Sequence, residues 1–229
     1  MIDFLQHPDF DRSVIICPHD DDGLIGSGGL IGRLSTCGEV SVIMLTDGSL
    51  GYVHAHLRGS ITDVRKTETE HAYAVVGVKN LFFLEFPDMC LRTYQCWRTP
   101  QGEPGAYQKV LRLLRQLRPS LVFTASEVDA HPDHRAANDV AKVAAIQSNA
   151  PIVPDLGEPT RIQRLYRYQV YEPLPGPVSS FPLSAQLSAL KRQALSAFVS
   201  QATVLERLEQ QEKISYEREV FSLQLDLSS

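Results

Sequence analysis

Short apolar runs alternate with helical patterns from about residue 13 to residue 170, and this alternation constrains the fold more than any other feature. The run Ser13 to Cys17 leads into a glycine-interrupted helical stretch, Leu24 to Ser35. Glu39 to Leu45 leads into a charged one, Thr62 to Val76. Parallel strands need crossover connections, which are usually helices. The alternation therefore predicts an α/β fold with a Rossmann-like, mostly parallel sheet flanked by helices.

The pattern continues and then changes near a proline-rich linker at 173–182. Beyond it we expect two helices, the second at Thr203 to Arg218, so that 183–229 is a helical segment packed on the rest. The length suits one domain over 1–229. The remaining expected elements are strands at Leu81 to Phe86, Leu121 to Ala125 and Arg164 to Val170, and helices at Pro104 to Arg118 and Asp133 to Gln147.

Two polar motifs each follow the carboxyl end of a predicted strand. They are His19-Asp20-Asp21-Asp22 and His131-Pro132-Asp133-His134. Strand ends of an open α/β sheet face one crevice, so we expect the active site there. Catalytic zinc takes three protein ligands and leaves one position for water, which predicts His19, Asp22 and His134 as ligands. Taken alone, Asp22 would be equally at home as a helix N-cap.

A dinucleotide site is disfavoured at the glycine-rich turn Gly26-Ser27-Gly28-Gly29. The fingerprint needs another glycine where the chain has Ile31, and three aspartates precede the turn where a pyrophosphate needs unopposed N–H groups.

Composition narrows the function further. The chain has 229 residues, 43% hydrophobic, with a formal net charge of -5, which lacks the basic bias of nucleic-acid binders. Met1 to Ser13 has no signal-peptide core, and no run is long enough to span a bilayer. The four cysteines show no C-x-x-C spacing and fit reduced thiols. We expect a cytoplasmic homo-oligomer with a small-molecule substrate and no nucleic-acid or membrane partner.

Three further residues of the motifs suit amide hydrolysis. Asp21, next to a predicted ligand, is the candidate general base for a metal-activated water. His131 is the candidate group that stabilises the oxyanion and then donates a proton to the leaving amine. Asp133 is positioned to orient His131 or to cap the helix that follows, and the two roles are compatible.

Both motifs resemble those of the PIG-L/LmbE-type family of metal-dependent N-deacetylases, whose usual first motif reads Pro-His-Pro-Asp-Asp-Glu. Matches extend over most of the chain. They are Pro18 to Asp22, Gly28-Gly29, Thr46-Asp47-Gly48, Arg65 with Glu68, Phe86-Pro87-Asp88, His131 to His134 and, more weakly, Lys191 and Ser200-Gln201.

The resemblance implies zinc on the three predicted ligands, Asp21 as base, His131 as acid and Asp133 as its support. It also implies Arg65 and Asp88 at a sugar-binding rim, with Glu68 and Asp47 supporting the site. Arg65 and Glu68 also have the spacing of a surface ion pair.

The implied reaction removes the acetyl group from an N-acetylated amino sugar, an N-acetylglucosaminyl conjugate. Cleavage of another amide, such as a thiol conjugate, and a non-catalytic metal-containing sugar- or nucleotide-binding protein are the alternatives. Two histidines and one carboxylate also suit Fe²⁺ or another divalent ion.

The chain departs from the family motif at Asp20, in place of proline, and at Gly23, in place of glutamate. If Asp20 points into the site, its charge should raise the pKa of Asp21. If it faces solvent, salt screens the effect.

Three other segments carry suggestive residues. His7-Pro8-Asp9 copies half of the second motif and is interpreted as an N-terminal arm. His54 and His56 lie in a stretch after the second strand, as substrate-contacting or solvated residues rather than metal ligands. Tyr94 and Trp97 lie in a long connection that forms a substrate wall, a hydrophobic flap or an oligomer contact.

Overall fold

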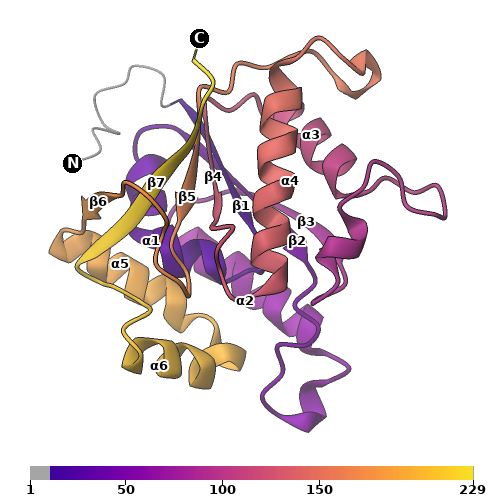
Figure 1. Cartoon of the computed structure of the whole chain (residues 1–229). Coiled ribbons are helices and arrows are strands. Elements are labelled where there is room, and N and C mark those ends of the chain that lie inside the picture. Colours follow the sequence, from indigo (N-terminus) through magenta and orange to yellow (C-terminus); the bar gives the residue numbers. More distant parts are fainter. Residues whose placement is uncertain (1–10, 229) are drawn as a thin grey trace.

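The protein, described by a computed structural model over residues 11–228, is built around one seven-stranded sheet in the order β3-β2-β1-β4-β5-β7-β6 (Figure 1). The predicted N-terminal arm at His7-Pro8-Asp9 lies outside the described residues. Strands β1 to β5 are parallel, and β7 runs antiparallel to both β5 and β6. The strands are β1 (Arg12–Cys17), β2 (Glu39–Thr46), β3 (Asn80–Phe86), β4 (Leu121–Ala125), β5 (Arg164–Tyr168), β6 (Ser179–Pro182) and β7 (Arg218–Asp226).

Helices cover both faces of the sheet, which confirms the predicted α/β class. Strand β1 shows why two cores form: Ile15 and Cys17 point into one, and Val14 and Ile16 into the other. None of the helices within 11–228 has the length and apolar character needed to cross a bilayer. On the first face lie α1 (Asp22–Ser35), α2 (Ile61–Val75), α5 (Ala185–Ser196) and α6 (Ala202–Gln210), and on the second α3 (Ala106–Leu117) and α4 (Pro132–Asn149).

The strand order places the two polar motifs side by side. Strand β1 lies between β2 and β4. After β1 the chain builds β2 and β3 on one side of it, and then β4 and β5 on the other side. The loops after β1 and β4 therefore diverge at a switch point of the sheet, where α/β proteins bind their ligands. In Figure 1 this end of the sheet faces the bottom, where α6 and the loop after β2 project.

Helix α1 is interrupted at Ser27, whose φ of -146° and ψ of 19° are not helical. The break frees the backbone N–H groups of Gly29 and Leu30, which donate to the two carboxylate oxygens of Glu219 at 2.8 Å each. A negative group is stabilised at the start of a helical segment by the helix dipole. Lys191 completes the contact, donating to Glu219 Oε1 at 2.9 Å and to the carbonyl of Ile25 at 2.7 Å.

The C-terminal segment differs from the prediction. Helices were expected over 183–229, but α6 ends at Gln210, and Arg218–Asp226 forms β7 inside the sheet. The apolar alternation of Phe221, Leu223 and Leu225 indicates a strand, and the neighbouring amphipathic helix obscured it. The predicted proline-rich linker likewise contains β6, which ends at Pro182 on the sheet edge, where proline is tolerated.

Gly26 lies where α1 packs closely against the end of β5. An added Cβ would lie 2.5 Å from Cδ2 of Tyr168 and 2.6 Å from the backbone oxygen of Gln169. We expect Gly26→Ala to lower the free energy of unfolding by about 1–3 kcal/mol, because the backbone oxygen cannot move aside cheaply. Denaturant unfolding measures this. Gly59→Ala, where no atom lies within 4 Å of the new Cβ, is the control and should change stability by less than about 0.5 kcal/mol. Equal stability of the two variants would contradict the expectation.

Candidate active site

The structure brings the three histidines of the two motifs together. His19 follows β1, and the ring centroids of His131 and His134, at the start of α4, lie 4.7 Å and 5.4 Å from that of His19. The His131 and His134 centroids are 4.9 Å apart. Local chemistry fixes this geometry: Nδ1 of His131 accepts a hydrogen bond from the backbone N–H of Asp133 at 3.2 Å and so caps α4.

Asp22 joins the two predicted imidazole ligands. Its Oδ2 lies 3.0 Å from Nδ1 of His19 and 3.1 Å from Nε2 of His134. Among the described residues, Oδ1 of Asp22 and both ring nitrogens of His134 are buried without a hydrogen bond of good geometry. Buried polar atoms are rarely left unpartnered in proteins. Nδ1 of His134 faces Oδ1 of Asp129 at 3.3 Å, so Nε2 of His134 and Oδ1 of Asp22 are the atoms that a divalent cation would satisfy, and the donor set fits a metal.

Other ligand combinations are also close. The ligand atoms of His19, His131 and His134 all lie within 4.8 Å of one another, and so do those of His19, Asp88 and Asp133. A single ion near His19 therefore has several donors within reach.

The carboxylates around the two buried rings favour positive charge there. Burial acts to lower the pKa of His19, but hydrogen bonds to three carboxylates raise it well above its usual value. Burial likewise acts to lower the pKa of His134, and the charges of Asp22 and Asp129 raise it to about 9. The site is thus built to hold a cation.

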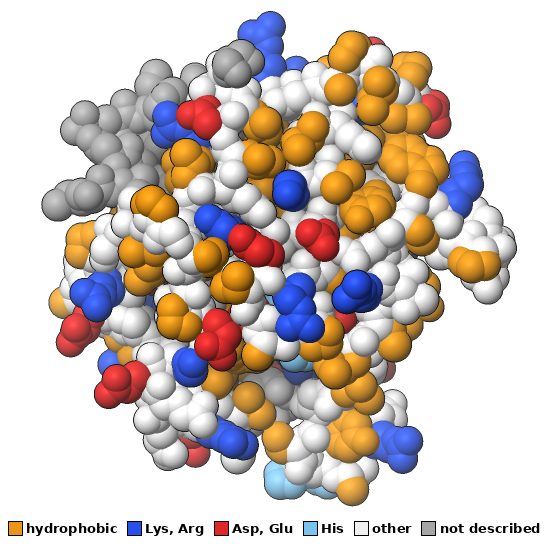
Figure 2. All heavy atoms as spheres, in the orientation of Figure 1, with side chains coloured by type: hydrophobic (Ala, Val, Ile, Leu, Met, Phe, Trp, Pro, Cys, Tyr) orange, Lys and Arg blue, Asp and Glu red, His pale blue; other side chains and the backbone are white. Residues whose placement is uncertain are grey.

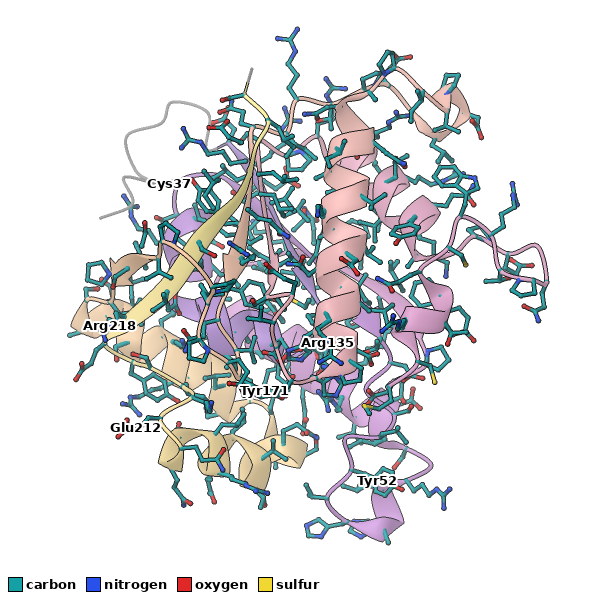
Figure 3. All side chains as sticks on the ribbon, in the orientation of Figure 1. Cys37, Tyr52, Arg135, Tyr171, Glu212 and Arg218 are labelled. Atoms are coloured by element: carbon teal, nitrogen blue, oxygen red, sulfur yellow. The ribbon has the colours of Figure 1, made fainter. Side chains whose placement is uncertain are left out.

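Asp129, which the sequence prediction missed, supports His134 from behind. Its Oδ1 lies 3.3 Å from Nδ1 of His134 and accepts the backbone N–H of His131 at 3.0 Å. Its Oδ2 accepts the backbone N–H of Tyr171 at 3.1 Å. The only feature of the sequence that could have indicated Asp129 is its place between the end of β4 and the second motif. Tyr171 stacks on His134 with centroids 5.0 Å apart, and Figure 3 labels Tyr171 toward the lower end of the sheet.

Asp21 lies beside the cluster without joining it. Burial raises the pKa of the Asp21 carboxyl to about 6, against the opposing charge of Arg65 and with the support of Asp22 and Asp20. A carboxylate whose pKa is nearer neutrality is a better proton acceptor at pH 7 than an exposed one.

Asp20 neither faces solvent nor points freely into the site. It is 8% exposed and forms a two-pronged ion pair with Arg65, which is 4% exposed. Nε of Arg65 donates to Oδ2 of Asp20 at 3.0 Å, Nη2 donates to Oδ1, and Thr69 donates to Oδ2 at 3.1 Å. Nη2 of Arg65 also lies 3.4 Å from Oδ1 of Asp21. Arg65 therefore lines the pocket with its charge paired to Asp20, and its role in sugar binding stays a prediction.

Asp133 and Asp88 hold the other side of His19. The carboxylate of Asp133 accepts the backbone N–H groups of Met89 at 2.6 Å and Leu91 at 3.1 Å, and its Oδ2 lies 3.6 Å from Nε2 of His19. Its hydrogen bond to His131 is through its own backbone N–H, while the charge of its carboxylate acts to raise the pKa of that ring, which burial lowers. The support of His131 by Asp133 stays a prediction.

Asp88 is closer to His19, with Oδ1 at 3.1 Å from Nε2. Burial acts to raise the pKa of Asp88, but the hydrogen bond from His19 lowers it to about 2.

The two residues predicted to support the site make structural contacts. Asp47 Oδ1 accepts the backbone N–H of Asp88 at 3.0 Å, which fixes the turn after β3. Glu68 accepts the backbone N–H of Ser200 at 2.8 Å and its hydroxyl at 2.6 Å, which ties α2 to the short turn before α6. These partners replace the surface ion pair between Arg65 and Glu68 that helical spacing allowed.

A pocket of about 240 Å³ opens over the cluster. Figure 2 shows hydrophobic side chains exposed at this lower end of the molecule. A larger recess, about 950 Å³, is lined by Arg118, Arg161 and others and contains none of the predicted site residues. The pocket over the cluster is lined by His19, Asp21, Leu50, Gly51, Arg65, Asp88, Met89, His131, Tyr171, Gln201 and Val204.

The remaining suggestive residues lie away from this pocket lining. His54 and His56 are exposed and stack on each other with centroids 5.6 Å apart, on the projecting loop that carries Tyr52 (Figure 3). Tyr94 packs 5.2 Å from Phe86, and both Tyr94 and Trp97 lie partly buried against the second core. Neither side chain lines the pocket over the cluster, and the roles of Tyr94 and Trp97 as substrate wall, hydrophobic flap or oligomer contact stay predictions.

Comparison with known proteins identifies the family of the chain. The PIG-L family model, described as GlcNAc-PI de-N-acetylase, matches residues 14–145. Diacetylchitobiose deacetylase of Thermococcus kodakarensis is 32% identical over 144 residues, which are 59% of this chain and 51% of that protein. The chain thus spans about half the length of that relative.

Two solved structures share the fold. The conserved protein TT1542 from Thermus thermophilus is 28% identical, with a TM-score of 0.76 over 93% of this chain and 94% of that one. N,N'-diacetylchitobiose deacetylase from Pyrococcus horikoshii is 24% identical, with a TM-score of 0.76 over 93% and 84%.

Proposed function

Since the chain belongs to the PIG-L family, we propose that it is a metal-dependent deacetylase, which removes the acetyl group from an N-acetylated amino sugar and releases acetate and a free amine. The observation that carries this proposal is the buried cluster of His19, Asp22 and His134, with unpartnered ligand atoms and a basic carboxylate, Asp21, beside it. The names of relatives, which include deacetylases of diacetylchitobiose and of an N-acetylglucosaminyl malate, support a glycoconjugate as substrate.

We propose zinc as the metal, on His19, Asp22 and His134, although Fe²⁺ suits the same donors. Bound there, it would polarise the amide carbonyl and lower the pKa of a water molecule to about 7. Oδ1 of Asp22, which has no hydrogen-bond partner among the described residues, and Nε2 of His134, 3.1 Å from Oδ2 of Asp22, support this ligand set.

The protein side chains then divide the proton transfers. Asp21 accepts a proton from the attacking water, helped by its raised pKa. His131, 4.7 Å from His19 between ring centroids, lines the pocket, stabilises the oxyanion and then donates a proton to the leaving amine nitrogen as the C–N bond breaks. Asp88 and Asp133 hold the ring of His19 in place.

We also propose that the chain acts as one domain, because β7, near the C-terminus, lies within the same sheet as β1. The homo-oligomer and the cytoplasmic location stay predictions.

The proposed reaction is tested by incubating purified, zinc-loaded protein with methyl N-acetylglucosaminide and related N-acetylglucosaminyl conjugates, and measuring acetate and new primary amine. We expect equal amounts of both products, and loss of both after chelation of the metal. Binding of a glycoside without any product would instead favour a non-catalytic sugar-binding protein.

We expect Asp129→Asn to weaken zinc binding about 10- to 100-fold, because the neutral amide no longer orients and polarises His134. Competition with a chromophoric chelator measures the dissociation constant, with His134→Ala as the variant that should lose the site. Asp155→Asn, at an exposed position in a short turn, is the matched control and should bind zinc normally. Normal affinity in Asp129→Asn would remove Asp129 from the site.

A further inference from the structure

Two exposed apolar side chains flank Asp88 at the mouth of the pocket. Leu50 is 57% exposed and Met89 is 50% exposed. Both are anchored by carboxylates of the site: the N–H of Leu50 donates to Oδ2 of Asp88 at 3.2 Å, and the N–H of Met89 donates to Oδ2 of Asp133 at 2.6 Å. The groups that surround His19 therefore also fix the position of these two side chains.

The backbone of Met89 is strained. Its φ of 62° lies in the left-handed region, which non-glycine residues rarely adopt. Strain of this kind persists only where the surroundings enforce it, and it concentrates at functional sites. Here the short hydrogen bond to Asp133 enforces a conformation that leaves an apolar side chain in solvent. Val204 and Tyr171 extend the apolar lining across the pocket.

Among the described residues, no lysine or arginine at the pocket is free to pair with an anionic group on the aglycone. Of the described residues that line it, Arg65 is the only lysine or arginine, and Asp20 already neutralises it through two hydrogen bonds. The carboxylates of Asp21 and Asp88 line the same space. A carboxylate or phosphate group on the aglycone would therefore lie near carboxylates of the same charge and would have no lysine or arginine to pair with.

We propose that Leu50 and Met89 bind the aglycone of the substrate, and that the site prefers N-acetylated amino sugars with an uncharged, apolar aglycone, such as an aryl or alkyl group, over those with an anionic one. This inference rests on the proposed deacetylase function and adds its substrate class. When an apolar aglycone packs against Leu50 and Met89, its apolar surface is removed from water, and this contact needs no charge.

Three glycosides of N-acetylglucosamine test it: the methyl, phenyl and 4-carboxyphenyl compounds, compared by kcat/KM for acetate release from the zinc-loaded protein. We expect phenyl to exceed methyl by about tenfold, the scale for part of a ring leaving water. We expect 4-carboxyphenyl to fall about tenfold or more below phenyl. If no glycoside releases acetate, the proposed function fails. If all three react equally, or the carboxylate is preferred, the function stands and the aglycone inference is wrong.

Two polar variants of similar size locate the contact. Met89→Gln keeps a non-glycine residue at the strained position, and Leu50→Asn keeps the bulk of the side chain. Each should reduce the phenyl-to-methyl ratio severalfold, and the double variant should bring it within about twofold of one. Val128→Asn is the matched control, because Val128 is 46% exposed and is not part of the pocket lining; its ratio should match the wild type. A wild-type ratio in the double variant would overturn the assignment of these two residues.

Discussion

Replacing Asp21 with asparagine is expected to lower kcat by about 10²- to 10⁴-fold while the protein keeps its metal. The amide has the shape of the carboxylate but cannot accept the proton of the attacking water. Asp21 is 8% exposed and lines the pocket without bridging the two predicted imidazole ligands, as Asp22 does. The substitution therefore removes the base and leaves His19, Asp22 and His134 in place.

Metal content by elemental analysis and acetate release at saturating substrate separate the two effects. Asp155→Asn, which makes the same chemical change at an exposed position, should keep both metal and rate. A wild-type kcat in metal-loaded Asp21→Asn would exclude Asp21 as the base. Loss of the metal would instead assign it to the ligand set.

Replacing Glu219 with glutamine is expected to lower the free energy of unfolding by about 3–5 kcal/mol, the usual cost of leaving one charge of a buried pair without its partner. Glu219 and Lys191 are 2% and 1% exposed, and their charged groups lie 2.9 Å apart. The glutamine would also lose one of the two acceptors that serve the N–H groups of Gly29 and Leu30.

Chemical denaturation of four proteins tests this: the wild type, Glu219→Gln, Lys191→Met and the double variant. The double variant should be more stable than the sum of the single losses predicts, because it buries no unpaired charge. Glu217→Gln, two residues away and exposed, should change stability by less than about 0.5 kcal/mol. A loss below about 1 kcal/mol in Glu219→Gln would show that the pair adds little.

The sequence predicted those parts of the fold and site that depend on short-range patterns. Strands β1 to β5 have apolar runs of strand length, and both motifs come directly after such runs, so their convergence follows from the order of a parallel sheet. The resemblance to a known family then suggested roles for individual residues. Those roles are proposals that the experiments above address.

The parts that escaped prediction depend on contacts between distant residues. The ion pair between Asp20 and Arg65 joins the loop after β1 to α2. From the sequence we considered only an Asp20 side chain that points into the site or one that faces solvent. Asp129 has no motif spacing and becomes recognisable only when its distance to His134 is known. Strand β7 was missed because the Glu/Gln/Arg-rich pattern of Thr203 to Arg218 was interpreted as one helix, although α6 ends at Gln210 and β7 begins at Arg218.

The contact of Glu219 with α1 has a consequence for how the protein forms during synthesis. The N–H group of Gly29 in α1 donates to the side chain of Glu219, which lies 190 positions later in the chain. Strand β7 must pair between β5 and β6 before Glu219 can reach α1. Ribosomes add about 5–20 residues per second, and α1 therefore waits about ten seconds or more for its partner. We expect nascent chains arrested before residue 219 to remain protease-sensitive around α1, and a folded active site to arise only after β7 has left the ribosome.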